Sequence, residues 1–360
     1  MAKTPVRYSA DVEDVKPDET ETIAALNQTF DRILERTADD YGHAVRSVHA
    51  KAHGFLEGTL TVHADLPPEL AQGLFITPGE HKVIMRFSTN AGDILPDTIS
   101  LPRGVALKVL DVDGERLPDA EGRTQDFIMV NGPVFQSKTA DKFLGNLKLL
   151  AGTTDKLEGT KEILSKALRG VNTVLSTVGI ESTKVQTLGG APNSDPLGET
   201  YYSVTPFRYG EYIAKFALFP VSKDLTDQTD TTIDASHRPD ALREVIRSEA
   251  RVLEMEWELR VQLCRDLDAQ PIEDPTVEWD QDDTPFQPVA TVRAARQDSL
   301  SEDKFQQIDE QMRFSIWTGL VAHRPLGNIN RARKETYRHS ADFRARVNGC
   351  PYHEPSGAPF

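Results

Sequence analysis

The chain has 360 residues, of which 38% are hydrophobic, and this is enough for a sizeable folded core. Its formal net charge of -15 argues against a nucleic-acid binder, because binding to phosphates needs a surplus of Lys and Arg. The two cysteines, Cys264 and Cys350, imply neither a disulfide framework nor a cysteine zinc site. No apolar signal core is evident, and no stretch approaches the ~20 apolar residues that span a bilayer, so we expect a cytoplasmic protein without a membrane span.

The first half of the chain combines one helical pattern with a block of strand patterns. Residues 1–19 are polar, and we expect a flexible segment there. Residues 20–41 carry apolar side chains at the spacing of an amphipathic helix. Further on, helical spacing returns near Phe143 and is expected to continue to about residue 178. Between these helices, alternating apolar runs separated by turn residues favour an antiparallel sheet, with strands at 59–64, 83–88, 104–112 and 126–130.

The second half repeats this mixture. Apolar runs predict strands at 212–221, 257–264 and 289–292, and helical spacing predicts helices at 239–253, 302–312 and 330–347. The acidic run 278–283 has some likeness to a calcium loop, but it lacks the central Gly and the closing Glu of that motif. We therefore interpret it as a solvated loop. Residues 348–360 are expected to form a tail.

Four histidines fall within one short stretch, and two of them suggest a possible metal site. His49 and His53 have the i,i+4 spacing that can place two imidazoles on one side of a zinc ion. However, Gly54 follows at once, and a strand pattern begins there, so a helix carrying both ligands would have to end immediately. A zinc site remains an alternative hypothesis for this segment.

Five short motifs follow one another in an informative order. They are 46–54 (Arg-Ser-Val-His-Ala-Lys-Ala-His-Gly), 86–93 (Arg-Phe-Ser-Thr-Asn-Ala-Gly-Asp), 102–108 (Pro-Arg-Gly-Val-Ala-Leu-Lys), 131–135 (Asn-Gly-Pro-Val-Phe) and 333–337 (Arg-Lys-Glu-Thr-Tyr). Taken singly, each has an ordinary interpretation as a strand entrance, a turn or a surface pair. Taken together, their content and order resemble the catalase superfamily over residues 20–347.

This resemblance implies a fold and a cofactor. The expected class is α/β (α+β), with an antiparallel β-barrel core surrounded by helices in a single domain at residues 20–347. The chain looks most like the short catalase-related peroxidases, or mini-catalases, that lack the C-terminal helical region of ordinary catalases. Members of the superfamily bind heme b, so we expect heme iron here.

The resemblance also assigns roles on the two faces of that heme. His49 matches the distal histidine that moves a proton between the two oxygens of peroxide. Ser88 would fix the orientation of its ring, and Asn131 would hold the peroxide by a neutral hydrogen bond. On the other face Tyr337 matches the ligand of the iron. Arg333, one helical turn earlier, would favour the ionised phenolate.

The remaining site residues would hold the heme itself. Arginines match the positions that bind the two propionates, because a guanidinium pairs with a carboxylate through two hydrogen bonds. Val48 would form a hydrocarbon wall beside the histidine, and Phe135 and Phe143 fall where aromatic side chains cover the ring. The arginines are Arg46, Arg86 and Arg344.

We therefore predict a heme-dependent peroxidase or catalase that cleaves hydrogen peroxide or an organic hydroperoxide via a ferryl intermediate. A small organic reductant or a second peroxide would reduce that intermediate, and the protein is expected to form a dimer or tetramer of identical chains. Gln136 departs from the second phenylalanine that catalases usually carry. The alternatives are rearrangement of a fatty-acid hydroperoxide, as in allene oxide synthases, and heme binding without catalysis. Val48 argues against the rearrangement, because those enzymes carry threonine at this position.

Overall fold

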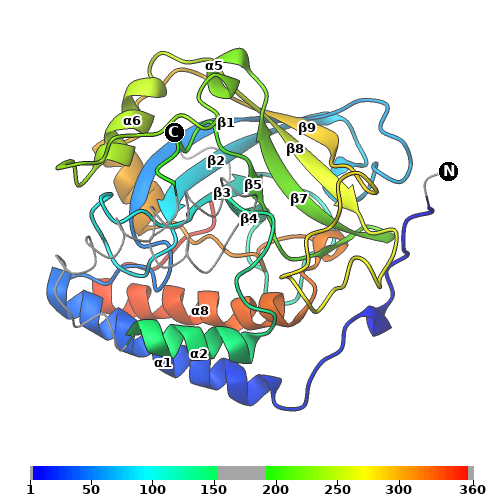
Figure 1. Cartoon of the computed structure of the whole chain (residues 1–360), viewed down its shortest axis with the longest axis horizontal. Helices are drawn as coiled ribbons and strands as arrows, with labels where there is room; N and C mark the ends of the chain where they lie inside the picture. The colour runs from blue at the N-terminus through cyan, green and yellow to red at the C-terminus, as the bar shows by residue number, and fades with distance from the viewer. Residues whose placement is uncertain (1–2, 152–191, 356–360) are drawn as a thin grey trace, which may run out of the picture.

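The centre of the molecule is a closed antiparallel β-barrel (Figure 1). The computed structural model describes residues 3–151 and 192–355, and its strands are β1 (Ala52–Val62), β2 (Gly79–Thr89), β3 (Arg103–Val109), β4 (Gln125–Val130), β5 (Tyr201–Tyr202), β6 (Phe207–Tyr209), β7 (Tyr212–Pro220), β8 (Met255–Leu263) and β9 (Gln287–Ala294). Because β5 pairs with both β4 and β7, eight of the described strands close into a ring, and β6 pairs only with β7.

Strands β2 and β3 of the barrel are buried on both faces over most of their length. Every residue of β3 is buried, and so is every residue of β2 from Val83 onward. Side chains that point inward fill the barrel, and those that point outward lie under covering segments. In this register Ser88 on β2 lies between Ala52 on β1 and Gly104 on β3. The barrel therefore brings three of the sequence motifs together.

Three long helices lie side by side against one side of the barrel (Figure 1). The described helices are α1 (Glu19–Tyr41), α2 (Ala140–Ala151), α5 (Lys223–Thr226), α6 (Ala241–Glu249), α7 (Glu302–Lys304) and α8 (Asn328–Asn348), with 3-10 turns at Ala10–Val12, Gly73–Phe75 and Val321–His323 and a π-helix at Phe305–Glu310. The long ones are α1, α2 and α8. Leu26 and Phe30 of α1 pack with Leu144 of α2 and Ile329 of α8. This apolar cluster holds α8 next to the barrel.

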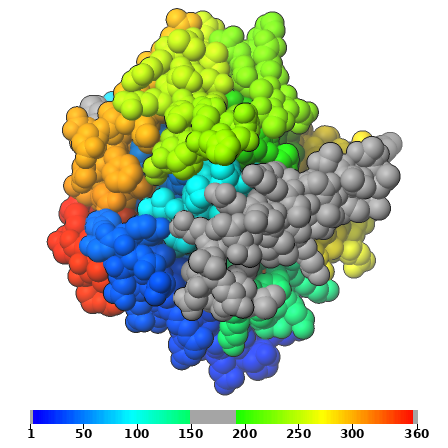
Figure 2. Space-filling model, turned by 60° about the vertical axis from the view of Figure 1, so that its left-hand side comes forward, coloured from blue at the N-terminus to red at the C-terminus, as the bar shows by residue number. Residues whose placement is uncertain are grey.

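Both ends of the described chain contact the barrel domain. Near the N-terminus the backbone N–H of Val6 donates to the Cys264 carbonyl over 2.8 Å. Near the C-terminus the carboxylate of Glu354 forms a 2.7 Å ion pair with the fully buried Lys108. At one edge of the molecule the end of α1, the π-helix region and the end of α8 lie side by side (Figure 2). Among the described helices, none has the length and apolar character needed to cross a bilayer.

Most elements predicted from the sequence are present, and the antiparallel barrel surrounded by helices is confirmed. Two predicted elements differ most from the structure. The first strand begins at Ala52 rather than at residue 59, so His53 lies inside β1. The helix predicted at 302–312 is a single turn followed by a π-helix. The expected continuation of the helix after Phe143 to residue 178 lies largely outside the described residues.

Candidate functional site

His49 lies in the segment between α1 and β1, and neighbouring backbone holds it in an unusual conformation. Its φ of 53° is in the left-handed region, which few residues other than glycine adopt. Its N–H donates to the Asn90 carbonyl over 3.2 Å, and the next N–H, that of Ala50, donates to the Ala91 carbonyl over 2.8 Å. The loop after β2 therefore sets the direction in which the His49 side chain leaves the backbone.

Two further contacts fix the imidazole ring. Nδ1 of His49 lies 3.0 Å from Oγ of Ser88. The ring also lies over the backbone of Gly104, where an added Cβ would approach Cε1 of His49 to 2.6 Å. Only glycine leaves room for the ring at that point of β3. When Nδ1–H donates to Ser88, Nε2 carries the free lone pair and can accept a proton.

The surroundings keep the His49 imidazole neutral. Burial, together with the positive charges of Arg86, Arg333 and Arg46, lowers its pKa to about 3. A neutral imidazole is the form that can take up a proton at physiological pH. The surroundings of His49 therefore keep its ring in the deprotonated form.

Tyr337 and Arg333 lie one turn apart on α8 and interact directly. Nη2 of Arg333 donates to the phenolic oxygen of Tyr337 over 3.0 Å. Nη1 of Arg333 donates to the side-chain oxygen of the buried Asn330 over 3.3 Å. Arg333 is thus oriented from two sides, and it places a positive charge against the oxygen that could bind a metal ion.

His49 and Tyr337 line the same space. Two adjoining hollows form a slot between the barrel and α8, and both residues line both hollows, as do Ser47, Val48 and Ile128. The slot is therefore bounded by a base on the barrel side and a phenol on the helix side. We call the first the barrel wall (His49, Ser88, Gly104, Asn131) and the second the helix wall (Arg333, Tyr337).

One end of the slot is lined by three arginines that contact Asp309, two through its carboxylate and one through its backbone carbonyl. Arg46 and Arg86 both donate to Oδ1 of Asp309, and Arg344 donates to the Asp309 carbonyl over 2.7 Å. Burial opposes ionisation of Asp309, but Arg86, Arg46 and Arg344 prevail and lower its pKa to about 2. Glu310 also lines this end and acts on Arg46 and Arg344, so two carboxylates face three guanidinium groups and an excess of positive charge remains for an anionic ligand.

The neighbouring positive charges also affect the pKa of the arginines themselves. Burial lowers the pKa of Arg46 well below its ordinary value, and the neighbouring charges of Arg344 and Arg86 act in the same direction. Arg344 is only 7% exposed, and its Nε has no hydrogen-bond partner. A buried donor without a partner is costly, and a bound carboxylate would satisfy it. The arginine end therefore fits a ligand with carboxylate groups.

The other end of the slot is apolar. Val48, Phe135 and Phe143 line this part or pack against it, together with Leu26 and Phe30 of α1. The rings of Phe135 and Phe143 are 5.5 Å apart, centre to centre. A flat, largely apolar ligand with acidic groups at one edge would match both ends of the slot.

Asn131 follows β4, and its side chain is held by two partners. Its Oδ1 accepts from the backbone N–H of Arg103 over 2.7 Å, and its Nδ2 donates to Glu199 over 2.9 Å. Glu199 is itself held by a two-point ion pair with Arg103, which is 1% exposed. One amide N–H of Asn131 remains for a ligand, since the amide group carries two donors.

The structure thus brings the predicted residues to one slot, and it adds partners that sequence reasoning missed. Gly104 belongs to the motif at 102–108. A glycine inside a strand can signal the close approach of another group, which here is the ring of His49. Glu199 and Asp309 carry no local signal, because their partners are far away in the sequence and Asp309 lies in a segment with an ordinary helical pattern.

The histidines do not converge on a metal site. His43 bonds Glu310 over 2.7 Å, His53 bonds Thr89 over 2.9 Å, and His63 bonds Thr291 over 2.8 Å. Among residues 3–151 and 192–355, no three His, Cys, Asp or Glu side chains gather as a metal site would require. The alternative zinc site at His49 and His53 therefore lacks support, and so does a calcium loop at 278–283.

Comparison with known proteins identifies the fold. The chain superimposes on catalase A from Saccharomyces cerevisiae with a TM-score of 0.61 at 17% identity, over 98% of this chain and 72% of that one. A fungal catalase gives 0.59 at 17% identity over 98% and 68%, and a bacterial catalase gives 0.58 at 19% identity over 98% and 66%. The chain has the catalase fold and is shorter than these proteins. Its sequence matches no protein-family model and no curated protein.

Proposed function

We propose that the chain is a catalase-related heme peroxidase that binds heme b in the slot between the barrel and α8. The observation that carries this proposal is the pair of polar couples that line one slot, His49 with Ser88 and Tyr337 with Arg333. The catalase fold supports it independently.

The residues of the slot fit this cofactor. The excess positive charge of Arg46, Arg86 and Arg344, with the unpartnered Nε of Arg344, suits the two propionates. Val48, Phe135 and Phe143 would cover the apolar ring. Tyr337 would bind the iron through its phenolic oxygen, and Arg333 would favour the charged form of that ligand. When bound, heme would supply the redox chemistry that cleaves the O–O bond of a peroxide.

His49 would then move the proton. Its neutral imidazole accepts a proton from one peroxide oxygen at Nε2 and returns it to the oxygen that leaves as water. Ser88 holds the tautomer in which Nε2 is free, since it is the partner of Nδ1. The remaining N–H of Asn131 would hold the peroxide, and a small organic reductant or a second peroxide would complete the cycle. We also propose that residues 20–347 form the heme domain.

The test is the rate of dye oxidation by hydrogen peroxide in the heme-supplied protein and in His49→Ala. Loss of a general acid–base residue lowers rates by about 10²–10⁴-fold, so we expect a loss in that range. His237→Ala is the matched control, because His237 is exposed, has a positive φ like that of His49, and lines neither hollow. If heme binds but His49→Ala keeps the full rate, the proposed mechanism is wrong and heme binding without catalysis by His49 is favoured.

A further inference from the structure

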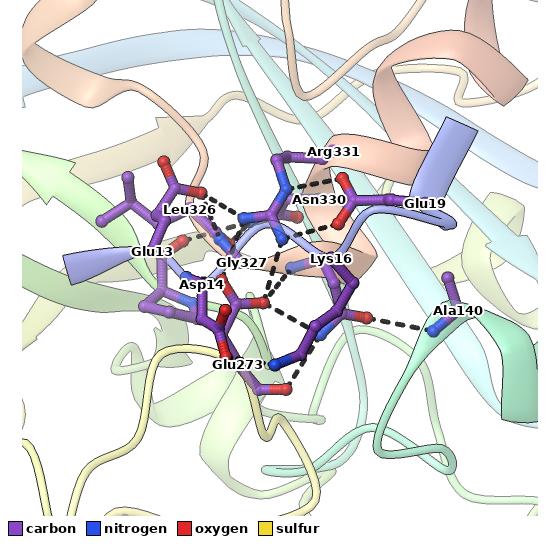
Figure 3. Close-up of polar contacts among 12 residues, drawn as sticks. Glu13, Asp14, Lys16, Glu19, Ala140, Glu273, Leu326, Gly327, Asn330 and Arg331 are labelled. Atoms are coloured by element: carbon purple, nitrogen blue, oxygen red, sulfur yellow. Dashed lines mark hydrogen bonds and ion pairs between the residues drawn. The ribbon is translucent and has the colours of Figure 1, made fainter. Parts of the chain in front are cut away.

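The first turn of α8 carries an arginine whose donors are fully used and which points away from the slot. Nε and Nη2 of Arg331 donate to the two carboxylate oxygens of Glu19 over 2.7 and 2.8 Å. Nη1 donates to Glu13 over 2.6 Å, and both terminal nitrogens donate to Glu273, over 2.9 and 3.1 Å (Figure 3). A guanidinium has five N–H donors, and all five are engaged here.

The three carboxylates come from separate parts of the chain. Glu13 lies in the N-terminal segment, Glu19 begins α1, and Glu273 follows β8. The side chains of Arg331, Glu13 and Glu19 are at most 12% exposed. Charged pairs shielded in this way are screened little by salt, and they hold their geometry better than surface pairs do. We call these four residues the Arg331 clamp.

The clamp also caps the N-terminus of α8. Glu13 accepts from the Gly327 N–H over 2.9 Å, and Glu273 accepts from the Asn328 N–H over 2.7 Å. The N-cap residue of α8 itself is Gly327, which has no side chain that could accept from these N–H groups. Carboxylates at a helix N-terminus satisfy free N–H groups and favourably oppose the helix dipole.

The clamp reaches a second helix through Asn328. Oδ1 of Asn328 accepts from the Ala140 N–H over 3.0 Å, at the start of α2, and Nδ2 of Asn328 donates to Glu273. Phe143, which packs against the apolar end of the slot, lies in the first turn of α2. One polar cluster therefore ties together α1, α2 and α8, the three helices that lie against the slot.

We propose that Arg331 is the positioning residue of the helix wall. This inference rests on the proposed function. Arg331 lies six residues before Tyr337 on the same helix, so its contacts fix the height and rotation of the first turns of α8. They set the direction in which Arg333 and Tyr337 face the slot. The N-terminal segment that carries Glu13 is thereby part of the machinery that holds the site.

The test compares Arg331→Met with Arg338→Met. Arg338 lies on the same helix, is 54% exposed, and pairs with Glu335 of its own helix, so its loss is a matched control. The first measurement is hydrogen exchange of the amides of residues 328–337 in the heme-free protein. Arg331→Met should accelerate this exchange by about 10-fold or more, which corresponds to the loss of one charge-assisted hydrogen bond. Arg338→Met should leave it unchanged.

The second measurement is the affinity for heme and the absorption spectrum of the loaded protein at a temperature where each variant is folded. We expect Arg331→Met to weaken heme binding by about 10–100-fold and to shift the spectrum, as the loss of a residue that orients a metal ligand does. Arg331→Lys should restore part of the heme affinity and part of the original spectrum, since lysine keeps the charge but cannot make the two-point contact.

Several outcomes are decisive. Unchanged exchange at residues 328–337 in Arg331→Met, with a lower melting temperature alone, would overturn the inference. If Arg331→Met does not fold, Glu13→Gln should show the same changes at smaller size, and their absence there would overturn it equally. If the unaltered protein binds no heme, the proposed function fails, while the exchange measurement still decides whether the clamp holds the first turns of α8.

Discussion

His49 on the barrel wall and Tyr337 on the helix wall face the same slot, but different kinds of contact hold them. The barrel wall is fixed by strand register, which places Ser88 opposite Gly104, and by backbone hydrogen bonds to the adjacent loop. The helix wall is carried by one helix whose first turn is held by side chains from distant segments. Substitutions on the barrel wall should therefore act locally, whereas substitutions far from the helix wall can change the position of Tyr337.

The largest effect is expected where the two walls are joined. The carboxylate of Asp309 is the shared partner of Arg46 and Arg86, which lie on the barrel side, and the Asp309 carbonyl accepts from Arg344 on α8. Asp309→Asn leaves buried arginines without their counter-charge, and such a loss costs about 3–5 kcal/mol. Denaturant unfolding of the heme-free protein should show this decrease, and the exposed Asp303→Asn should not. A decrease below about 1 kcal/mol would mean that Asp309 does not balance these charges.

The next effect tests the close approach on the barrel wall. Gly104→Ala adds a Cβ that would lie 2.6 Å from Cε1 of His49, so the ring must move. A displacement of about 1 Å can cost ~100-fold in rate, and we expect a loss of that order in peroxide-dependent dye oxidation. Gly79→Ala on β2 is the control, because nothing lies within 4 Å of its added Cβ. Equal rates for both variants would contradict the assigned role of Gly104.

A smaller effect is expected from the partner of the ring. Ser88→Ala removes the group that lies 3.0 Å from Nδ1 of His49 and leaves the ring in place. Loss of such an orienting partner lowers activity by about 10–100-fold, and we expect the lower part of that range because Gly104 still confines the ring. Ser88→Thr, which keeps a hydroxyl, should retain more activity than Ser88→Ala. The reverse order would argue against this hydrogen bond.

The smallest effect concerns pH. Because burial and three arginines lower the pKa of His49 to about 3, His49 stays neutral from pH 5 to 8. The peroxide reaction should therefore show no acid limb near pH 6.5 that belongs to His49. The same shift determines how His49 affects the free energy of unfolding. The unfolded chain binds the proton of His49 more tightly than the folded chain does. The contribution of His49 to stability is therefore present above pH 6.5 and is lost as pH falls toward 3. An acid limb near 6.5 that disappears in His49→Ala would contradict this account.

The sequence was sufficient for most elements, though not for the short strands β5 and β6, and for the residues that line the slot, because strand periodicity and short motifs are local signals. His49, Ser88 and Tyr337 each lie within a quoted motif, and the structure brings them to one space. The partners that hold them were not predictable in this way. Asp309 and Glu199 contact their arginines only after the chain has folded, and no spacing along the chain predicts such a contact.

The central claim is that Tyr337 binds heme iron from the helix wall. The most direct test is the absorption spectrum of the heme-supplied protein, of Tyr337→Phe, and of Tyr352→Phe as the control, since Tyr352 lines the same slot at its arginine end. The account predicts a ferric tyrosinate spectrum that is lost in Tyr337→Phe and kept in Tyr352→Phe. A spectrum that is unchanged by Tyr337→Phe, or lost only in Tyr352→Phe, would contradict it.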